Sequence, residues 1–80
     1  MHMSRMALCE LPVGKGGVVT EKICAPSLEI RMEDLGLTEG TRVRCLHKSP
    51  AGSPAAYEIR GAVIALRRVD AAQIMVEAEL

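Results

Sequence analysis

The chain has 80 residues, 49% of them apolar, and its 10 basic and 10 acidic residues give a formal net charge of +0. This length, about half that of a typical domain, excludes a TIM barrel, a dinucleotide-binding fold and any enzyme that closes a second domain over its substrate. With one Tyr and no Trp or Phe, the chain lacks the aromatic platform of single-stranded nucleic-acid binders. Its balanced charge gives no overall attraction to phosphate, so we expect an aliphatic core and no nucleic-acid partner.

Nothing in the sequence indicates a secreted or membrane protein. No apolar run approaches the roughly 20 residues that span a bilayer, and the N-terminus lacks the apolar segment of a signal peptide. Cys9, Cys24 and Cys45 are an odd number without a CxxC pair, which favours reduced thiols over a disulfide scaffold. We therefore expect a cytoplasmic protein without direct membrane insertion.

A single domain is expected over residues 1–80, with its core at about residues 8–77 and with residues 1–5 disordered or left from an expression tag. Residues 6–9 are expected to form a short extended arm. Residues 17–24 are predicted to be a strand with buried Val19 and Ile23.

The clearest helix signal covers residues 28–35. Leu28, Met32 and Leu35 lie at i, i+4 and i+7 and so form one apolar stripe, and Ser27 before them is a suitable N-cap. Gly36 supplies the left-handed residue that ends the helix. The leucine after it is expected to fold back onto Met32, as in a Schellman motif.

A second strand is predicted over residues 41–47, with Val43, Cys45 and His47 on one face. The Pro- and Gly-rich residues 48–54 are expected to form the next loop.

Two further strands are predicted after this loop. Residues 56–60 place Tyr57 and Ile59 inward, and Gly61 indicates a tight turn or bulge. Residues 62–68 are almost continuously apolar, which is typical of a central strand covered on both faces.

The C-terminal region predicts a capped helical turn and a closing strand. Asp70 and Gln73 have the spacing of a capping box, and Val76, Ala78 and Leu80 alternate with glutamates. The chain therefore predicts a mostly β fold: a small SH3-like barrel of about five strands with one short inserted α-helix and a capped helical turn near the C-terminus.

The parts of a catalytic site are missing. Residues 14–17, Gly-Lys-Gly-Gly, lack the hydroxyl residue and following helix of a phosphate-binding loop, so we interpret them as a turn. Nucleophilic catalysis needs a base and a group that orients it, and only His47 beside Ser49 approaches such a set. We predict no catalytic residue and no bound cofactor, and hence no enzyme.

Cys45 and His47 provide half of a metal site, because residues two apart on a strand face the same side. Zinc or iron needs further ligands, which the spacing does not place. The alternative is that Cys45 is a small buried hydrophobe and His47 a solvated residue. The two remain candidate ligands for weak binding of Fe²⁺ or Zn²⁺.

Four arginines are candidate partner contacts. Arg42 and Arg44 share an outward strand face, Arg60 points out from the next strand, and Arg67 lies near the end of the following strand. If these strands are neighbours, they form a basic patch, while the acidic residues gather on the helix. Such a bipolar surface suits docking to a protein. Ordinary charged solvation of a small barrel is the alternative.

Two longer motifs resemble the FeoA family. Residues 31–41, R-M-E-D-L-G-L-T-E-G-T, and Val43 resemble the family signature R-L-x-D-L-G-L-x-P-G-T-x-V, with Glu39 where Pro is common. Residues 61–71, G-A-V-I-A-L-R-R-V-D-A, resemble G-x-x-I-A-L-R-x-x-D/E-A.

Two shorter motifs extend this resemblance over nearly the whole chain. Residues 8–14, L-C-E-L-P-V-G, are similar to L-x-x-L-x-x-G. Residues 50–54, P-A-G-S-P, are similar to P-x-G-D-P, with Ser53 where Asp is usual. That difference is expected to change how the loop is held.

The resemblance implies a cytoplasmic SH3-like protein of ferrous iron uptake. It implies protein–protein contact with the cytoplasmic part of FeoB, the membrane ferrous-iron transporter, and it supplies no catalytic residues. It does not imply an oligomeric state, so a homo-oligomer is an open alternative. The alternatives are a protein that binds a transition metal directly, or a regulatory module related to the C-terminal domain of iron-dependent repressors.

Overall fold

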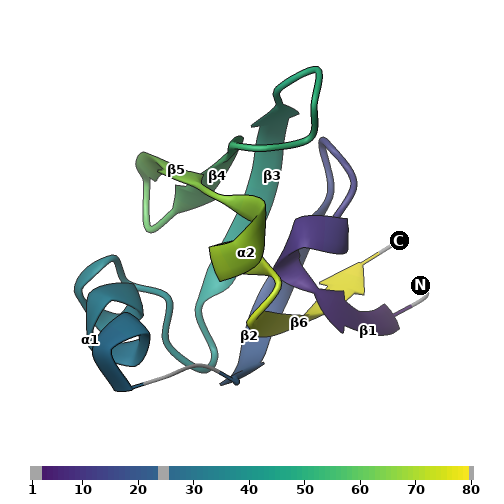
Figure 1. The fold of residues 1–80 in the computed structure, drawn as a ribbon. Coiled ribbons are helices and arrows are strands. Elements are labelled where there is room, and N and C mark those ends of the chain that lie inside the picture. Colours follow the sequence, from purple (N-terminus) through teal and green to yellow (C-terminus); the bar gives the residue numbers. More distant parts are fainter. Residues whose placement is uncertain (1–2, 24–25, 80) are drawn as a thin grey trace.

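The computed structural model of the chain describes residues 3–23 and 26–79 (Figure 1). In chain order its elements are β1 (Met3–Ala7), a 3-10 helix (Leu8–Glu10), β2 (Gly16–Lys22), α1 (Pro26–Asp34), β3 (Arg42–Lys48), β4 (Ala55–Ile59), β5 (Ala62–Leu66), α2 (Arg68–Ala71) and β6 (Ile74–Glu79). Neither of the described α-helices has the length and hydrophobicity needed to cross a bilayer.

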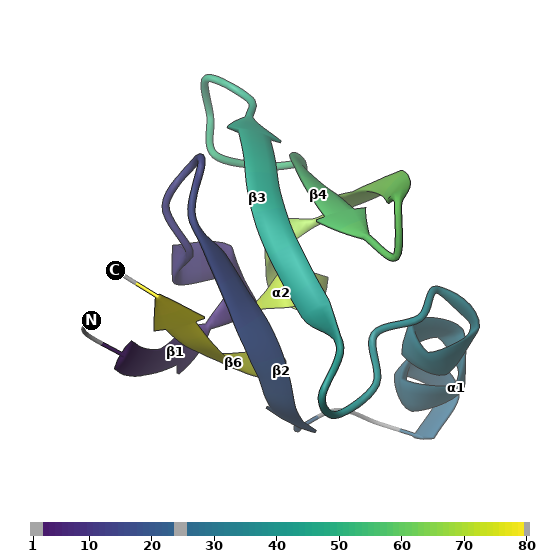
Figure 2. The same ribbon diagram turned by 180° about the vertical axis from the view of Figure 1, so that it is seen from behind.

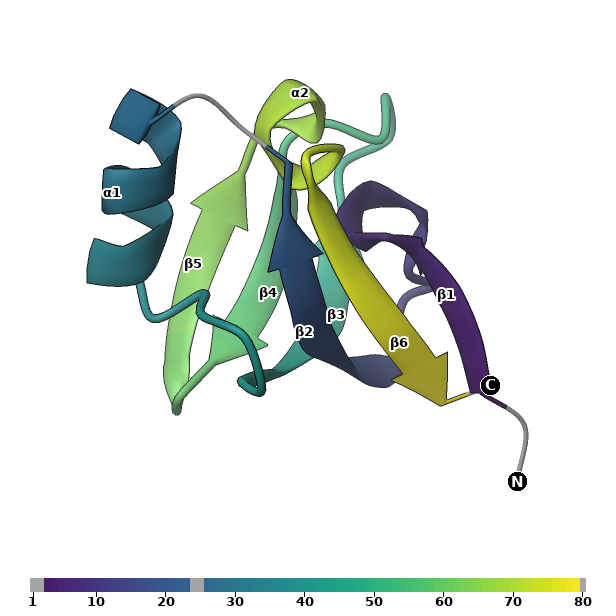
Figure 3. The same cartoon turned by 90° about the horizontal axis from the view of Figure 1, so that it is seen from below.

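The strands form one six-stranded antiparallel sheet in the order β1-β6-β2-β3-β4-β5. The sheet twists and curls around the interior, and α1 lies beside it (Figures 2 and 3). The strand beyond the predicted five is β1, in which Met3 pairs with Glu79 and Arg5 with Glu77. Contrary to expectation, residues 3–5 therefore belong to the folded sheet.

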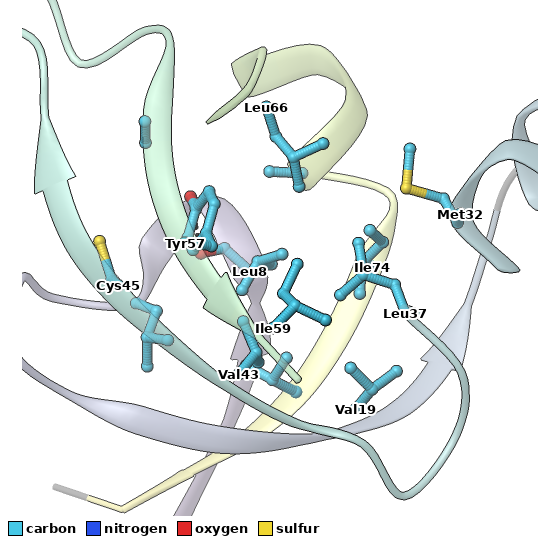
Figure 4. Close-up of a cluster of buried hydrophobic side chains, with 14 of the residues drawn as sticks. Leu8, Val19, Met32, Leu37, Val43, Cys45, Tyr57, Ile59, Leu66 and Ile74 are labelled. Carbon is cyan, nitrogen blue, oxygen red and sulfur yellow. Dashed lines mark hydrogen bonds between the residues drawn. The ribbon is translucent and has the colours of Figure 1, made fainter. Parts of the chain in front are cut away.

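An aliphatic core fills the inside of the curled sheet, as the composition predicts (Figure 4). Leu8, Ile74 and Val76 are fully buried, and Tyr57 is only 1% exposed. The Tyr57 hydroxyl donates a hydrogen bond to the Leu8 carbonyl at 3.4 Å, which joins β4 to the 3-10 helix. Burial of each large apolar side chain stabilises the fold by about 1.5–3 kcal/mol.

The predicted helix is present, but it begins earlier than expected. Pro26 is the first residue of α1, a position that suits proline because its missing N–H would have no partner there. Ser27 therefore lies in the first turn, and its predicted role as N-cap is wrong.

The C-terminal end of α1 confirms the predicted Schellman motif. Gly36 has φ +91°. The Leu37 N–H donates to the Met32 carbonyl at 2.8 Å, and the Gly36 N–H donates to the Glu33 carbonyl at 2.9 Å. Met32 and Leu37 are both fully buried, so the helix end is joined to the core.

One-residue register shifts in β2 and β3 alter two predicted faces. In β2 the shift lies between Val19 and Glu21. Val19 is buried as predicted, but Ile23 is 63% exposed, because an inserted residue reverses the alternation beyond it. In β3 the shift lies between Cys45 and His47, so Cys45 is buried while His47 is exposed. Cys24 lies outside the described residues.

The β4–β5 hairpin confirms the turn but not the central strand. Tyr57 and Ile59 face inward, and the turn follows at Gly61 as predicted. In contrast, β5 is an edge strand that pairs only with β4, and Val63 is 66% exposed. The prediction of a covered central strand over residues 62–68 is therefore wrong: the apolar run lies at an open edge of the sheet.

The helical turn near the C-terminus is capped by another segment. Arg67 occupies the N-cap position of α2, and Asp70 lies inside the helix, so the predicted capping box is wrong. Instead, Ser53 Oγ accepts a hydrogen bond from the Arg68 N–H at 3.0 Å. The loop between β3 and β4 thus supplies the acceptor that a local cap would otherwise provide.

We expect Ser53→Ala to lower the free energy of unfolding by about 1 kcal/mol, the usual cost of losing a helix cap. Ser53→Asp should retain the native stability or exceed it, because a carboxylate also accepts this N–H and favours a helix N-terminus. Urea denaturation at neutral pH measures both values. Equal stability of Ser53→Ala and the unchanged protein would contradict the capping role.

Burial raises the pKa of Tyr57 to about 12, and the nearby Cys45 and Cys9 add to this effect. Between pH 10 and 12 the unfolded chain therefore loses the phenolic proton first, and the free energy of unfolding falls by up to about 3 kcal/mol. Because the chain contains one Tyr, the absorbance of tyrosinate follows this group alone.

The matched control for this prediction is Tyr57→Phe, which keeps the buried ring but cannot titrate. Between pH 10 and 12 the free energy of unfolding of this variant should fall less than that of the unchanged protein, because the variant has no phenol to titrate. A tyrosine absorbance midpoint near pH 10 in the folded protein would contradict the prediction.

Candidate functional site

An open groove of about 810 Å³ lies over the exposed residues of β3 and its neighbours. Its walls come from the turn before β2, the loop before β3, the strands β3 and β4, the β4–β5 turn and the end of β6. The lining residues are Gly14, Lys15, Gly16, Glu39, Gly40, Thr41, Arg42, Val43, Arg44, Glu58, Arg60, Gly61 and Glu79. Four of them are glycines, so much of the surface is main chain.

Strand register explains how charged residues meet at this groove. Gly16 of β2 pairs with Arg44 of β3, and Arg44 pairs with Glu58 of β4. Because directly paired residues point to the same side of a sheet, Arg44 lies between a residue without a side chain and a carboxylate. Because Gly16 has no side chain, nothing from β2 covers the side of the Arg44 side chain that faces β2.

The groove has mixed charge rather than a purely basic surface. Arg42 forms an ion pair with Glu79 at 3.6 Å, with the two side chains 72% and 36% exposed. Arg44 faces Glu58 across the ladder, whereas Arg60 is in none of the ion pairs found among the described residues. An exposed pair such as Arg42–Glu79 contributes little stability, so it can exchange for a partner's carboxylate at small cost.

The tip of the β4–β5 hairpin holds Arg60 at the rim of the groove. Arg60 and Gly61 have φ +53° and +81°, as the two central residues of a type I′ turn require. The stem of Arg60 passes over Gly36, where a Cβ atom would lie 3.1 Å from Arg60 Cδ. The glycine that ends α1 thus also makes room for an arginine of the candidate site.

The structure brings together Arg42, Arg44 and Arg60 but not Arg67. Ile59 and Ala62 flank the turn near Arg60, while Arg67 follows Leu66 at the opposite end of the same hairpin. A strand of five residues spans roughly 17 Å. Arg67 instead pairs with Asp70 at 3.3 Å, beside the start of α2.

Sequence reasoning did not identify the acidic residues of the groove. The alternation of Glu58 with the inward Tyr57 and Ile59 indicates that its side chain faces outward, but not that it meets the arginines. Glu79 also alternates with apolar neighbours, but its position beside Arg42 depends on the pairing of β6 with β2, which the local sequence does not show.

The candidate metal ligands do not converge. Cys45 is fully buried, and this burial raises the pKa of its thiol although the charge of Lys48 and a hydrogen bond from the His47 main chain act against the increase. A thiol binds metal as the thiolate, so a raised pKa disfavours ligation. His47 is exposed beyond the register shift. Within residues 3–23 and 26–79, no group of three or more His, Cys, Asp or Glu residues could hold a metal ion.

The curled six-stranded sheet and the helix inserted between β2 and β3 define an SH3-like barrel, and an open charged groove lies on its outer face. The FeoA domain family matches residues 6–78. The chain belongs to the FeoA family, which is linked to ferrous iron transport.

Solved structures support both the family and the fold. FeoA from Chlorobium tepidum is 32% identical with a TM-score of 0.86, and the match covers 94% of this chain and 71% of that chain. FeoA from Stenotrophomonas maltophilia, solved with zinc and put forward as an SH3 domain protein that activates ferrous iron transport, is 30% identical with a TM-score of 0.78 over 92% and 95% of the two chains.

A manganese-dependent transcriptional repressor contains the same fold, with a TM-score of 0.87 and 20% identity over 94% of this chain and 41% of that chain. No curated protein matches the sequence. The predicted FeoA family and SH3-like fold are therefore confirmed. The predicted likeness to the C-terminal domain of iron-dependent repressors has a counterpart, at the level of fold alone, in this manganese-dependent repressor.

We expect Cys45→Ser combined with His47→Ala to leave the binding of Zn²⁺ and Fe²⁺ unchanged, because the two side chains do not meet at one site. Anaerobic calorimetric titration of the unchanged and the doubly substituted protein measures the difference. Weakening by about tenfold or more, the effect of losing an important ligand interaction, would contradict this prediction.

Proposed function

We propose that this protein is a small cytoplasmic accessory protein of ferrous iron uptake that acts by contact with the cytoplasmic part of FeoB. Membership of the FeoA family supports the link to iron transport. The observation that carries the proposed contact is the gathering of Arg42, Arg44 and Arg60 around one open groove. The partner surface that fits this groove presents carboxylates spaced along an exposed segment.

The charge arrangement favours orientation and fast association. Guanidinium groups form bidentate hydrogen bonds to carboxylates, and complementary charge raises the association rate more than the affinity. The glutamates Glu39, Glu58 and Glu79 lie in the same groove and reject a uniformly acidic partner. Discrimination by a mixed pattern suits an accessory protein that must select one partner.

Action by binding rather than catalysis is part of this proposal. The described residues present an open, solvated groove, and its arginines and glutamates lie side by side at exposed positions. Exposed charges that are paired and solvated in this way are typical of the polar part of a protein contact surface.

Direct metal binding is the second candidate function. The zinc complex of the Stenotrophomonas maltophilia relative favours it. Burial of Cys45 and exposure of His47 in this chain weigh against a site made by these two residues. The titration of the doubly substituted protein described above decides this candidate.

We expect the combined substitution Arg44→Gln and Arg60→Gln to raise the Kd for the purified cytoplasmic part of FeoB by roughly tenfold, because two charge contacts are lost at once. Calorimetry or surface plasmon resonance, with and without a guanine nucleotide, measures this change. The salt dependence of the association rate should decrease in parallel.

The matched control is Arg31→Gln, which removes an exposed arginine of α1 outside the groove. Arg67→Gln should also have little effect, because Arg67 lies at the far end of the hairpin. No binding by the unchanged protein in either nucleotide state, or an equal loss in Arg31→Gln, would overturn the proposal.

A further inference from the structure

The outer edge of β5 has no strand partner among the described residues, because β5 ends the sheet and pairs only with β4. The type I′ turn makes Ile59 and Ala62 a hydrogen-bonded pair. Hydrogen-bonded and non-hydrogen-bonded pairs alternate along an antiparallel ladder, so the main-chain N–H and C=O groups of Val63 and Ala65 point away from β4. Two N–H donors and two C=O acceptors therefore line one open edge.

The side chains of this edge are apolar and exposed. Val63 is 66% exposed, Ala62 and Ala65 are exposed, and Val69 just beyond the strand is 62% exposed. The register between β4 and β5 is regular, and the sequence of β5, Ala-Val-Ile-Ala-Leu, contains no charge and no proline. The usual devices that prevent edge pairing are thus absent from the strand itself.

The charges at the two ends of β5 select what can pair with it. Arg60 precedes the strand and Arg67 and Arg68 follow it. The antiparallel register that pairs the whole of two β5 strands would bring the turn residue Arg60 of each copy close to Arg67 and Arg68 of the other, just beyond the ends of the paired strands. Like charges brought together at the strand ends are destabilising, whereas acidic residues there are stabilising.

We infer that β5 is a docking edge for an extended segment of another protein, with β-branched residues at its centre and acidic residues at both ends. The segment adds a seventh strand through the main-chain groups of Val63 and Ala65, as in other cases of strand addition. Its carboxylates meet Arg60 at one end and the Arg67–Arg68 pair at the other. This inference shares Arg60 with the proposed FeoB contact. Its main-chain contacts belong to the β5 edge alone, so protection of the Val63 and Ala65 amides tests it separately from the groove variants.

The test uses a synthetic peptide, acetylated and amidated, with the centre Val-Thr-Val-Thr-Val and two acidic residues at each end. Hydrogen exchange followed by NMR reports the individual amides of the unchanged protein. At saturation we expect the Val63 and Ala65 amides to exchange at least about tenfold more slowly, because only hydrogen-bonded amides are protected. The peptide with lysines at its ends should give no such protection.

Ala65→Pro removes one outward N–H without removing a hydrogen bond to β4, so an edge strand tolerates it. We expect this variant to weaken peptide binding by roughly fivefold to tenfold, as the loss of one hydrogen bond and the bulk of the ring predict. Ala65→Thr keeps the N–H and is the matched control. If Ala65→Pro fails to fold, the exchange measurement on the unchanged protein decides alone.

Three outcomes would overturn the inference. No protection with the acidic peptide would show that the edge does not accept a strand. Equal protection with the lysine peptide would remove the charge selection. Protection of Val63 and Ala65 that rises with protein concentration without peptide, together with a dimer in sedimentation, would identify a second copy as the occupant.

Discussion

The burial of aliphatic side chains inside one curled sheet is the constraint on which the rest of this small domain depends. The inward positions of β3 and β4 are occupied by core residues such as Val43, Cys45 and Tyr57. A core of this size leaves little room for a polar cavity, because each buried polar group would need a partner. The polar groups that the fold offers to a ligand or partner therefore lie on the exposed face of the sheet and at its edges.

The groove and the β5 edge are parts of one continuous exterior. Strand register aligns Gly16, Arg44, Glu58 and Val63 in a row across β2, β3, β4 and β5. Along this row the surface changes from bare main chain to charge and then to apolar side chains. The two surfaces accordingly suit different contacts, since the groove offers charge pairing and the edge offers main-chain hydrogen bonds.

The same core explains why Cys45 and His47, two residues apart on a strand, do not face a common side. Cys45 contributes to the packed interior, where a thiolate is disfavoured, and the register shift after it separates His47 from its side of the sheet. A similar displacement exposes Ile23 and moves a predicted core position to the surface. In both cases a single extra residue in one strand changes which side chains share a face.

Local signals in the sequence determined the features that depend on neighbouring residues alone: the helix that ends at Gly36, the alternation of Tyr57 and Ile59, and the turn at Gly61. Tertiary structure decided that β5 is an edge, that Ser53 caps α2 and that Arg67 stands apart from the other arginines. An apolar run in the sequence has the same pattern whether the strand lies at the centre of a sheet or at its open edge. Strand order and register, which arise from pairing between distant segments, are what distinguish the two.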